Sequence, residues 1–225
     1  MSPALKKLGL VALYAIAMAW VESAVVVYLR TLIGRMLPYQ PDPLPIFGGL
    51  GWIEAGREAA TLVMLLAVGC LAGGSRRVRL AYALIAFAVW DIFYYVFLVP
   101  MSGWPHSLLD WDVLFLLPLP WWGPVLAPVL ISLLLLAGGL LVTQSEAGLH
   151  PLWPRPWAWR LHLAGAGLAL YAFMETPLHA LPGGAAAVRS ALPASFNWPL
   201  FAAALALFAA PLVDMARQLL RPSPS

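Results

Sequence analysis

The strongest constraint on this chain is a series of apolar stretches, each about as long as a membrane is thick. A helix needs about 20 mostly apolar residues to cross ~30 Å of hydrocarbon. Several stretches meet this length directly, at 8–33, 52–73, 80–101, 159–179 and 198–219. Because irregular backbone cannot face lipid, we predict an all-α, polytopic membrane helix bundle that forms one integral membrane domain over 1–225.

A further span lies within a proline-rich stretch that is too long for one straight helix. Residues 113–143 contain Pro118, Pro120, Pro124 and Pro128. We predict a spanning helix over 124–143, which brings the expected number of transmembrane helices to about six. A short helical piece is expected before it, over 107–117, because Ser107 and Asp110 resemble a capping box.

The distribution of basic residues indicates how the bundle lies in the membrane. With the N-terminus inside, nine of the 13 Lys and Arg residues fall on the cytoplasmic side and four on the outer side. The positive-inside rule therefore predicts an N-in/C-in topology. The proline-broken segment 102–123 then lies on the outer side, as a partial lid. Because the composition is rich in Ala, Leu, Pro and Trp, we expect a multi-pass protein of a bacterial plasma (inner) membrane.

The composition excludes several classes of protein. Apolar residues make up 62% of the chain and charged residues 10%, whereas a soluble domain is about half apolar and a quarter charged. The formal net charge is only +3 and the basic residues are scattered, so nucleic acid is excluded as a partner. A single cysteine excludes a disulfide framework and cysteine-based metal sites. The partner that the composition does imply is the lipid bilayer.

Ionisable residues inside the expected spans are the candidates for function, because each is costly in lipid. At 1.5 Å per residue, Glu22, Glu58, Asp91 and Glu175 fall about 17–24 Å from the inner membrane surface. Four helices therefore place a carboxyl group at a similar height. This agreement predicts a polar pocket in the outer half of the bundle.

Helical spacing adds neighbours to this pocket. Glu54 and Glu58 are four residues apart and share a helix face, with Arg57 beside them. Tyr94 and Tyr95 follow Asp91 by one helical turn, and the outer segment supplies two further polar or aromatic side chains. The residues expected to contact a substrate are Arg57, Glu54, Tyr94, His106 and Trp104.

The most specific hypothesis for the pocket is a metal site. Carboxylates and imidazoles from facing helices hold the metal centres of helical bundles, and this ligand set suits Fe, Mn or Zn. The expected ligands are Glu22, Glu58, Asp91, Glu175 and His179. Glu-x-x-His on two helices, the usual signature, is absent from the sequence. The pocket would then belong to an enzyme acting on a lipophilic small molecule, with Asp91 and Glu58 as acid–base groups and Tyr95 orienting Asp91.

Three other hypotheses stay open at this stage. The charges could satisfy one another and hold helices together, as in a structural subunit of a membrane complex. They could relay protons or cations in a transporter, which would need a polar path to the cytoplasmic face. They could also perform acid–base chemistry without a metal on an isoprenoid or a quinone, beside aromatic walls that include Trp90 and Phe93.

Overall fold

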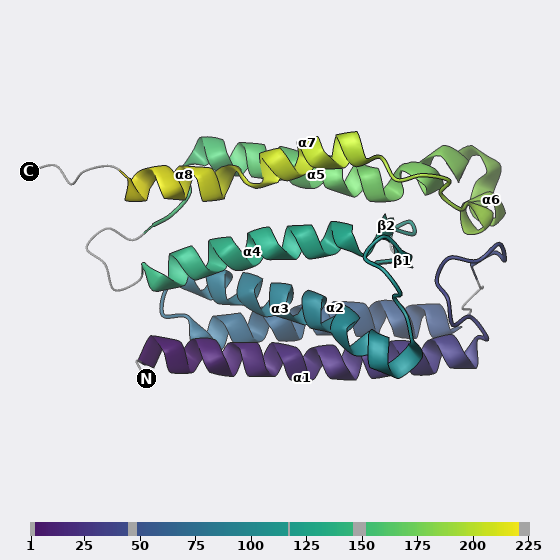
Figure 1. Cartoon of the computed structure of the whole chain (residues 1–225), viewed down its shortest axis with the longest axis horizontal. Helices are drawn as coiled ribbons and strands as arrows, with labels where there is room; N and C mark the ends of the chain where they lie inside the picture. The colour runs from purple at the N-terminus through teal and green to yellow at the C-terminus, as the bar shows by residue number, and fades with distance from the viewer. Residues whose placement is uncertain (1–2, 45–48, 117, 146–151, 221–225) are drawn as a thin grey trace, which may run out of the picture.

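Long helices run side by side along the whole molecule (Figure 1). The computed structural model describes residues 3–44, 49–116, 118–145 and 152–220. The helices are α1 (Pro3–Leu32), α2 (Gly49–Ala72), α3 (Arg76–Ser102), α4 (Leu126–Gln144), α5 (Pro156–Ala180), α6 (Gly184–Ser190), α7 (Trp198–Phe208) and α8 (Ala210–Leu219). The expected all-α membrane helix bundle is therefore confirmed.

The helices assemble into a group around α3 and a separate pair. Helix α3 packs against α1, α2 and α4, whereas α5 packs mainly against α7. The first group is held by a buried cluster that includes Val11, Leu65 and Tyr82. The pair is held by a second cluster around Phe173 and Phe201. Figure 1 shows α5 and α7 as an outer layer beyond α4.

Most of the expected membrane spans meet the length and composition that a bilayer requires. In the part of the chain that the structure describes, five segments qualify: Ala4–Leu32, Trp52–Ala72, Arg76–Ser102, Leu126–Gln144 and Trp198–Leu219. Helix α5 is 25 residues long but is not one of these segments; it carries ionisable side chains towards both of its ends. The start of α1 and the end of α8 lie at the same end of the bundle (Figure 1), which agrees with the even number of passes expected from the sequence.

The final pass is two helices rather than the single helix expected over 198–219. Helix α7 ends at Phe208 and α8 begins at Ala210. Proline has no backbone N–H, so Pro211 cannot donate the hydrogen bond that would continue the helix. At the other end of this pass, Asn197 caps α7 by accepting a 3.2 Å hydrogen bond from the backbone N–H of Leu200.

The helical piece expected over 107–117 is wrong. Strand β1 (Trp111–Val113) instead pairs antiparallel with β2 (Trp122–Pro124). A further backbone hydrogen bond of 2.8 Å, from Leu114 to Trp121, extends the hairpin. Aromatic and β-branched residues favour strands, and prolines 118 and 120 prevent a helix from continuing towards α4. Leu117 itself lies outside the described residues.

The resemblance of Ser107 and Asp110 to a capping box has a different explanation in the structure. The hydroxyl of Ser107 accepts a 3.0 Å hydrogen bond from the N–H of Leu109, two residues later. The carboxylate of Asp110 accepts a 2.8 Å hydrogen bond from the N–H of His106. Both side chains therefore stabilise a turn, which is the usual alternative to capping for these residue types.

Residues 33–44 form a strap across the outer end of the bundle. The hydroxyl of Tyr39 donates a 2.8 Å hydrogen bond to the carbonyl of Pro193, and its ring stacks on Trp111 of β1 at 5.8 Å. The N–H of Leu44 donates to the carbonyl of Arg189 at 2.9 Å. The strap thus connects α1 to the segments around α6 and closes over the hairpin.

Candidate functional site

A cavity of about 270 Å³ lies between α1, α2, α3, α4 and the β1–β2 hairpin. Its outer rim includes the strap, through Arg35, Pro38 and Leu44. Much of the wall is aromatic and comes from α3, the hairpin segment and α5: Phe87, Trp90, Tyr94, Tyr95, Phe115, Trp121 and Phe173. Ligand pockets are typically apolar with a few polar groups, and this cavity has that composition.

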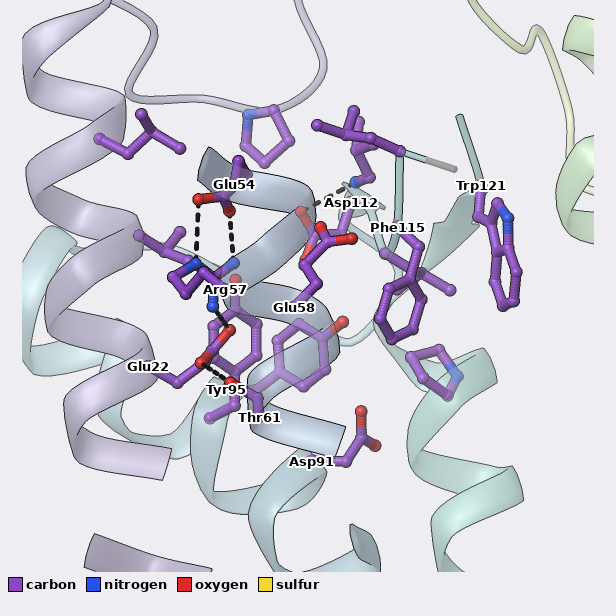
Figure 2. A pocket seen from close by; sticks show the side chains of 18 of the residues that line it. Glu22, Glu54, Arg57, Glu58, Thr61, Asp91, Tyr95, Asp112, Phe115 and Trp121 are labelled. Carbon is purple, nitrogen blue, oxygen red and sulfur yellow. Dashed lines mark hydrogen bonds and ion pairs between the residues drawn. The ribbon is translucent and has the colours of Figure 1, made fainter. Parts of the chain in front are cut away.

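One side of the cavity is an ion-paired cluster centred on Arg57. Figure 2 shows the Arg57 guanidinium between the carboxylates of Glu22 and Glu54. Arg57 Nε donates to Glu54 at 2.9 Å, and the Thr61 hydroxyl donates to Glu22 at 3.1 Å. Positions 54, 57 and 61 share a face of α2 because they are three and four residues apart. For Arg57, Glu22 and Glu54, the charges therefore satisfy one another.

A second ion pair joins α1 to the hairpin. Arg30 donates to Asp112 at 3.0 Å, and its guanidinium lies 4.6 Å from the ring centre of Trp104. The N–H of Val113 and the hydroxyl of Tyr95 also donate to Asp112. Asp112 is only 1% exposed, and burial raises the pKa of its carboxyl group although Arg30 and these hydrogen bonds oppose the shift.

Two carboxyl groups of the cavity form no salt bridge within the described ranges, although the charge of Arg57 acts on one of them, Glu58. Asp91 accepts a 2.7 Å hydrogen bond from the Ser132 hydroxyl on α4, and Figure 2 shows it pointing from α3 into the pocket. Glu58 lines the cavity and makes no hydrogen bond or salt bridge with the residues that the structure describes. Both side chains are half-buried. They are the acidic groups left available to a bound molecule. The indole N–H groups of Trp90 and Trp121, Arg30 Nη1 and Arg35 Nε also have no hydrogen-bond partner in the described chain.

The structure brings together most, but not all, of the residues expected in the pocket. Six of them line the cavity: Glu22, Glu54, Arg57, Glu58, Asp91 and Tyr94. Tyr95 lines it too, but its hydroxyl bonds to Asp112 rather than orienting Asp91. The side chain that donates a hydrogen bond to Asp91 is Ser132 instead.

Four of the expected residues lie outside the cavity. Glu175 on α5 accepts hydrogen bonds of 3.2 and 3.4 Å from the amide of Asn197, and His179 is one turn further along the same helix. Trp104 is buried behind the wall, against Arg30 and Tyr95. His106 is exposed and pairs with Asp110 at 3.3 Å.

The five expected metal ligands are not gathered at one point. Glu22, Glu58 and Asp91 line the cavity, whereas Glu175 and His179 do not. In residues 3–44, 49–116, 118–145 and 152–220, no group of three or more His, Cys, Asp or Glu side chains is close enough to hold a metal ion. Fe, Mn or Zn binding therefore stays a prediction without a ligand cluster in the described chain.

Several cavity residues are not among the site residues expected from the sequence. Asp112 lies in a loop by sequence and enters the site only because the hairpin folds inwards. Ser132 and Thr61 are uncharged, so a search for ionisable residues in spans does not find them. The one feature of the sequence that could have indicated Ser132 and Thr61 is weak: both are hydroxyl residues within apolar helices, where hydroxyls commonly form hydrogen bonds to other helices.

The opposite half of the bundle contains a smaller and apolar cavity of about 130 Å³. Helices α3, α4, α5 and α8 line it, and His162 is its one titratable residue in the described chain. The Nδ1 atom of His162 already lies 2.9 Å from the carbonyl oxygen of Phe208. The polar cluster of the outer half therefore does not continue through this cavity.

Comparison with known proteins adds no family to these observations. No protein-family model, curated protein or solved structure matches the chain.

Proposed function

We propose that this membrane protein binds a lipophilic small molecule in the cavity of about 270 Å³, with the polar part of the molecule at Glu58 and Asp91. One observation carries the proposal: an aromatic-walled cavity contains two carboxyl groups that form no salt bridge in the described chain. An engineered cavity of ~150 Å³ holds a benzene ring, so this one has room for a larger ring or a ring with substituents.

The alternative that the charges serve only to hold helices together accounts for part of the cluster. Arg57 and Arg30 each have carboxylate partners, and such pairs join α1 to α2 and to the hairpin. Glu58 makes no such contact among the described residues, and Asp91 contributes only the hydrogen bond from Ser132 on α4. Ionisable groups within a membrane are costly, and those that are found there usually serve a function. Glu58 and Asp91 therefore favour a binding role.

A proton- or cation-coupled transporter has less support. Alternating access needs a polar route from the site to the opposite face. In the described part of the chain, the opposite half offers an apolar cavity with His162 as its titratable residue. A binding protein or an enzyme, which needs only one opening, agrees better with this distribution of polar groups.

If the bound molecule is also a substrate, Glu58 and Asp91 are the groups placed to exchange protons with it. A carboxyl group in an apolar site can act as a general acid or base on its ligand. Tyr95 has a positioning role instead, because its hydroxyl is bonded to Asp112. We also propose the N-in/C-in orientation, on the distribution of basic residues, and a bacterial plasma membrane, on the composition.

The proposal is tested by filling the cavity. Ile131 lines the cavity on α4, whereas Leu133 on the same helix is 49% exposed and does not line it. The wild type, Ile131→Trp and Leu133→Trp would be purified in an uncharged detergent, extracted with organic solvent and compared by mass spectrometry.

We expect one lipophilic compound at close to one molecule per chain in the wild type and in Leu133→Trp, and its loss in Ile131→Trp. Equal amounts in all three proteins, or no stoichiometric compound in any of them, would contradict the proposal. Elemental analysis of the same samples would test the predicted Fe, Mn or Zn.

A further inference from the structure

We infer that the molecule bound in this cavity is a lipophilic organic cation, such as a tertiary or quaternary amine on an apolar body. The inference rests on the proposed function and narrows the class of its ligand. It follows from three features of the site: the charges left without partners, the aromatic walls and the size of the space.

The charged groups that line the cavity leave a negative excess. The lining acids outnumber the lining arginines five to three; the acids are Glu22, Glu54, Glu58, Asp91 and Asp112. Two of the three arginines are ion-paired. Arg57 pairs with two carboxylates and Arg30 with one.

The third arginine is held by backbone rather than by a ligand. Arg35 donates hydrogen bonds to carbonyl groups of the strap, including that of Asp42 at 2.8 Å and that of Pro38 at 3.1 Å. Burial lowers the pKa of its guanidinium, and the charge of Asp42 opposes this effect. In this lining, the arginine donors without a hydrogen-bond partner among the described residues are Arg30 Nη1 and Arg35 Nε. An anionic ligand could reach at most these two N–H groups and would face five carboxyl groups.

A cation would find the opposite situation. Glu58 and Asp91 offer carboxyl oxygens that form no salt bridge in the described chain, in a cavity where charges are poorly screened. A neutral ligand would leave both groups without a counter-charge, so they would have to take up protons to become neutral. A cation compensates them and needs no proton to be taken up by the protein.

The walls are suited to the same kind of ligand. Around Asp91 on α3 stand Trp90, Tyr94 and Tyr95, and the Trp90 and Tyr94 rings stack at 6.3 Å. On the facing side, the Trp121 ring lies parallel to that of Phe173 at 6.5 Å. Aromatic faces attract cations, and quaternary ammonium groups are commonly bound by several rings together.

The size and composition of the space favour an organic cation over a metal ion. A metal ion would need several ligands at one point, and the described residues hold no such group. A cavity of about 270 Å³ with mostly apolar walls instead matches an ammonium group that carries hydrocarbon. The carboxyl groups would bind the charge, and the aromatic rings would bind the body.

The test compares two probes that differ by one atom. Benzyltrimethylammonium is a cation, and neopentylbenzene has the same shape with carbon in place of the charged nitrogen. Binding of each probe to the purified full-length protein in an uncharged detergent would be measured by calorimetry. The wild type should bind the cation about tenfold tighter or better, although the neutral compound is the more hydrophobic of the two.

Variants then locate the selectivity. Asp91→Asn and Glu58→Gln, singly and together, keep the side-chain shape and remove the charge. The ratio of the affinity for the cation to that for the neutral probe should therefore fall towards one. Glu175→Gln is the matched control, because Glu175 is a half-buried carboxyl group outside the cavity; it should keep the wild-type ratio. Ile131→Trp should abolish binding of both probes, and Leu133→Trp should preserve it.

Each outcome decides between the two proposals. Binding of neopentylbenzene as tight as that of the cation would overturn the inference and leave the proposed function standing. Failure of both probes to bind would also overturn it, and the extraction experiment would then decide the proposed function separately. Should the double variant fail to fold, the ratio of the two affinities in the wild type alone decides the question.

Discussion

The guanidinium of Arg30 and the carboxylate of Asp112 meet at 3.0 Å although they lie 82 positions apart in the chain. Arg30 belongs to the outer end of α1 and Asp112 to β1. This contact fixes the hairpin against the bundle and so forms the outer wall of the cavity. Both residues are at least nine-tenths buried. Loss of one partner would therefore leave the other charge buried and unpaired.

Loss of Arg30 should destabilise the fold strongly. Arg30→Met leaves Asp112 buried without its counter-charge, and removing one partner of a buried pair costs roughly 3–5 kcal/mol. The double variant Arg30→Met/Asp112→Leu should be less destabilised than the single variant, because no buried charge remains. Free energies of unfolding would be measured by titration with a denaturing detergent. A double variant that is less stable than Arg30→Met would contradict this view of the pair.

Stability should depend on pH through Asp112. Burial raises the pKa of this carboxyl group in the folded chain, so the folded chain binds the proton more tightly than the unfolded chain does. The contribution of Asp112 to the free energy of unfolding is therefore largest below the pKa of an unfolded aspartate, about 3.9. It is lost as pH rises through the raised pKa of the folded chain. Compared with Arg30→Met/Asp112→Leu, the wild type should lose stability as pH rises from about 3.9 to above the raised pKa of Asp112. Parallel pH profiles for the two proteins would refute the assignment.

The long helices could be predicted from the sequence because a membrane span needs one continuous apolar stretch of fixed length. The shorter features could not. The hairpin at 111–124 forms because two three-residue strands meet through tertiary contacts, and neither strand has a periodicity long enough to recognise. The break between α7 and α8 has a local cause, Pro211, but a proline in a span does not by itself show where the helix stops.

The candidate site could be predicted only in part, for a geometric reason. Counting residues gives the expected height of a side chain in the membrane, and Glu22, Glu58 and Asp91, which were predicted at one level, do line one cavity. It does not give the direction in which a helix faces around the bundle. Glu175 has a similar predicted height, but α5 turns it towards Asn197. Asp112 comes from a loop, for which no height could be counted.

Reporter fusions can establish the orientation in the membrane. We expect a reporter placed after Gly103, between α3 and the hairpin, to lie outside the cytoplasm. A reporter placed after Gly74, in the turn between α2 and α3, should lie inside, next to Arg76, Arg77 and Arg79. Enzymatic reporters that are active in only one compartment make this measurement. The opposite pattern would reverse the topology and place the cavity on the cytoplasmic side.

The contact between α5 and α7 depends on the absence of a side chain at Gly165. A Cβ atom at this position would lie 2.6 Å from both the carbonyl oxygen of Ala204 and the backbone nitrogen of Phe208, and backbone atoms cannot move aside as a flexible side chain can. Gly165→Ala should therefore lower the free energy of unfolding by about 1–3 kcal/mol. Gly167 is the control on the same helix: a Cβ atom there meets nothing within 4 Å, and Gly167→Ala should be neutral or stabilising by up to about 1 kcal/mol, from helix propensity. Equal effects of the two substitutions, measured by the same detergent titration, would show that this close approach does not contribute to holding the pair together.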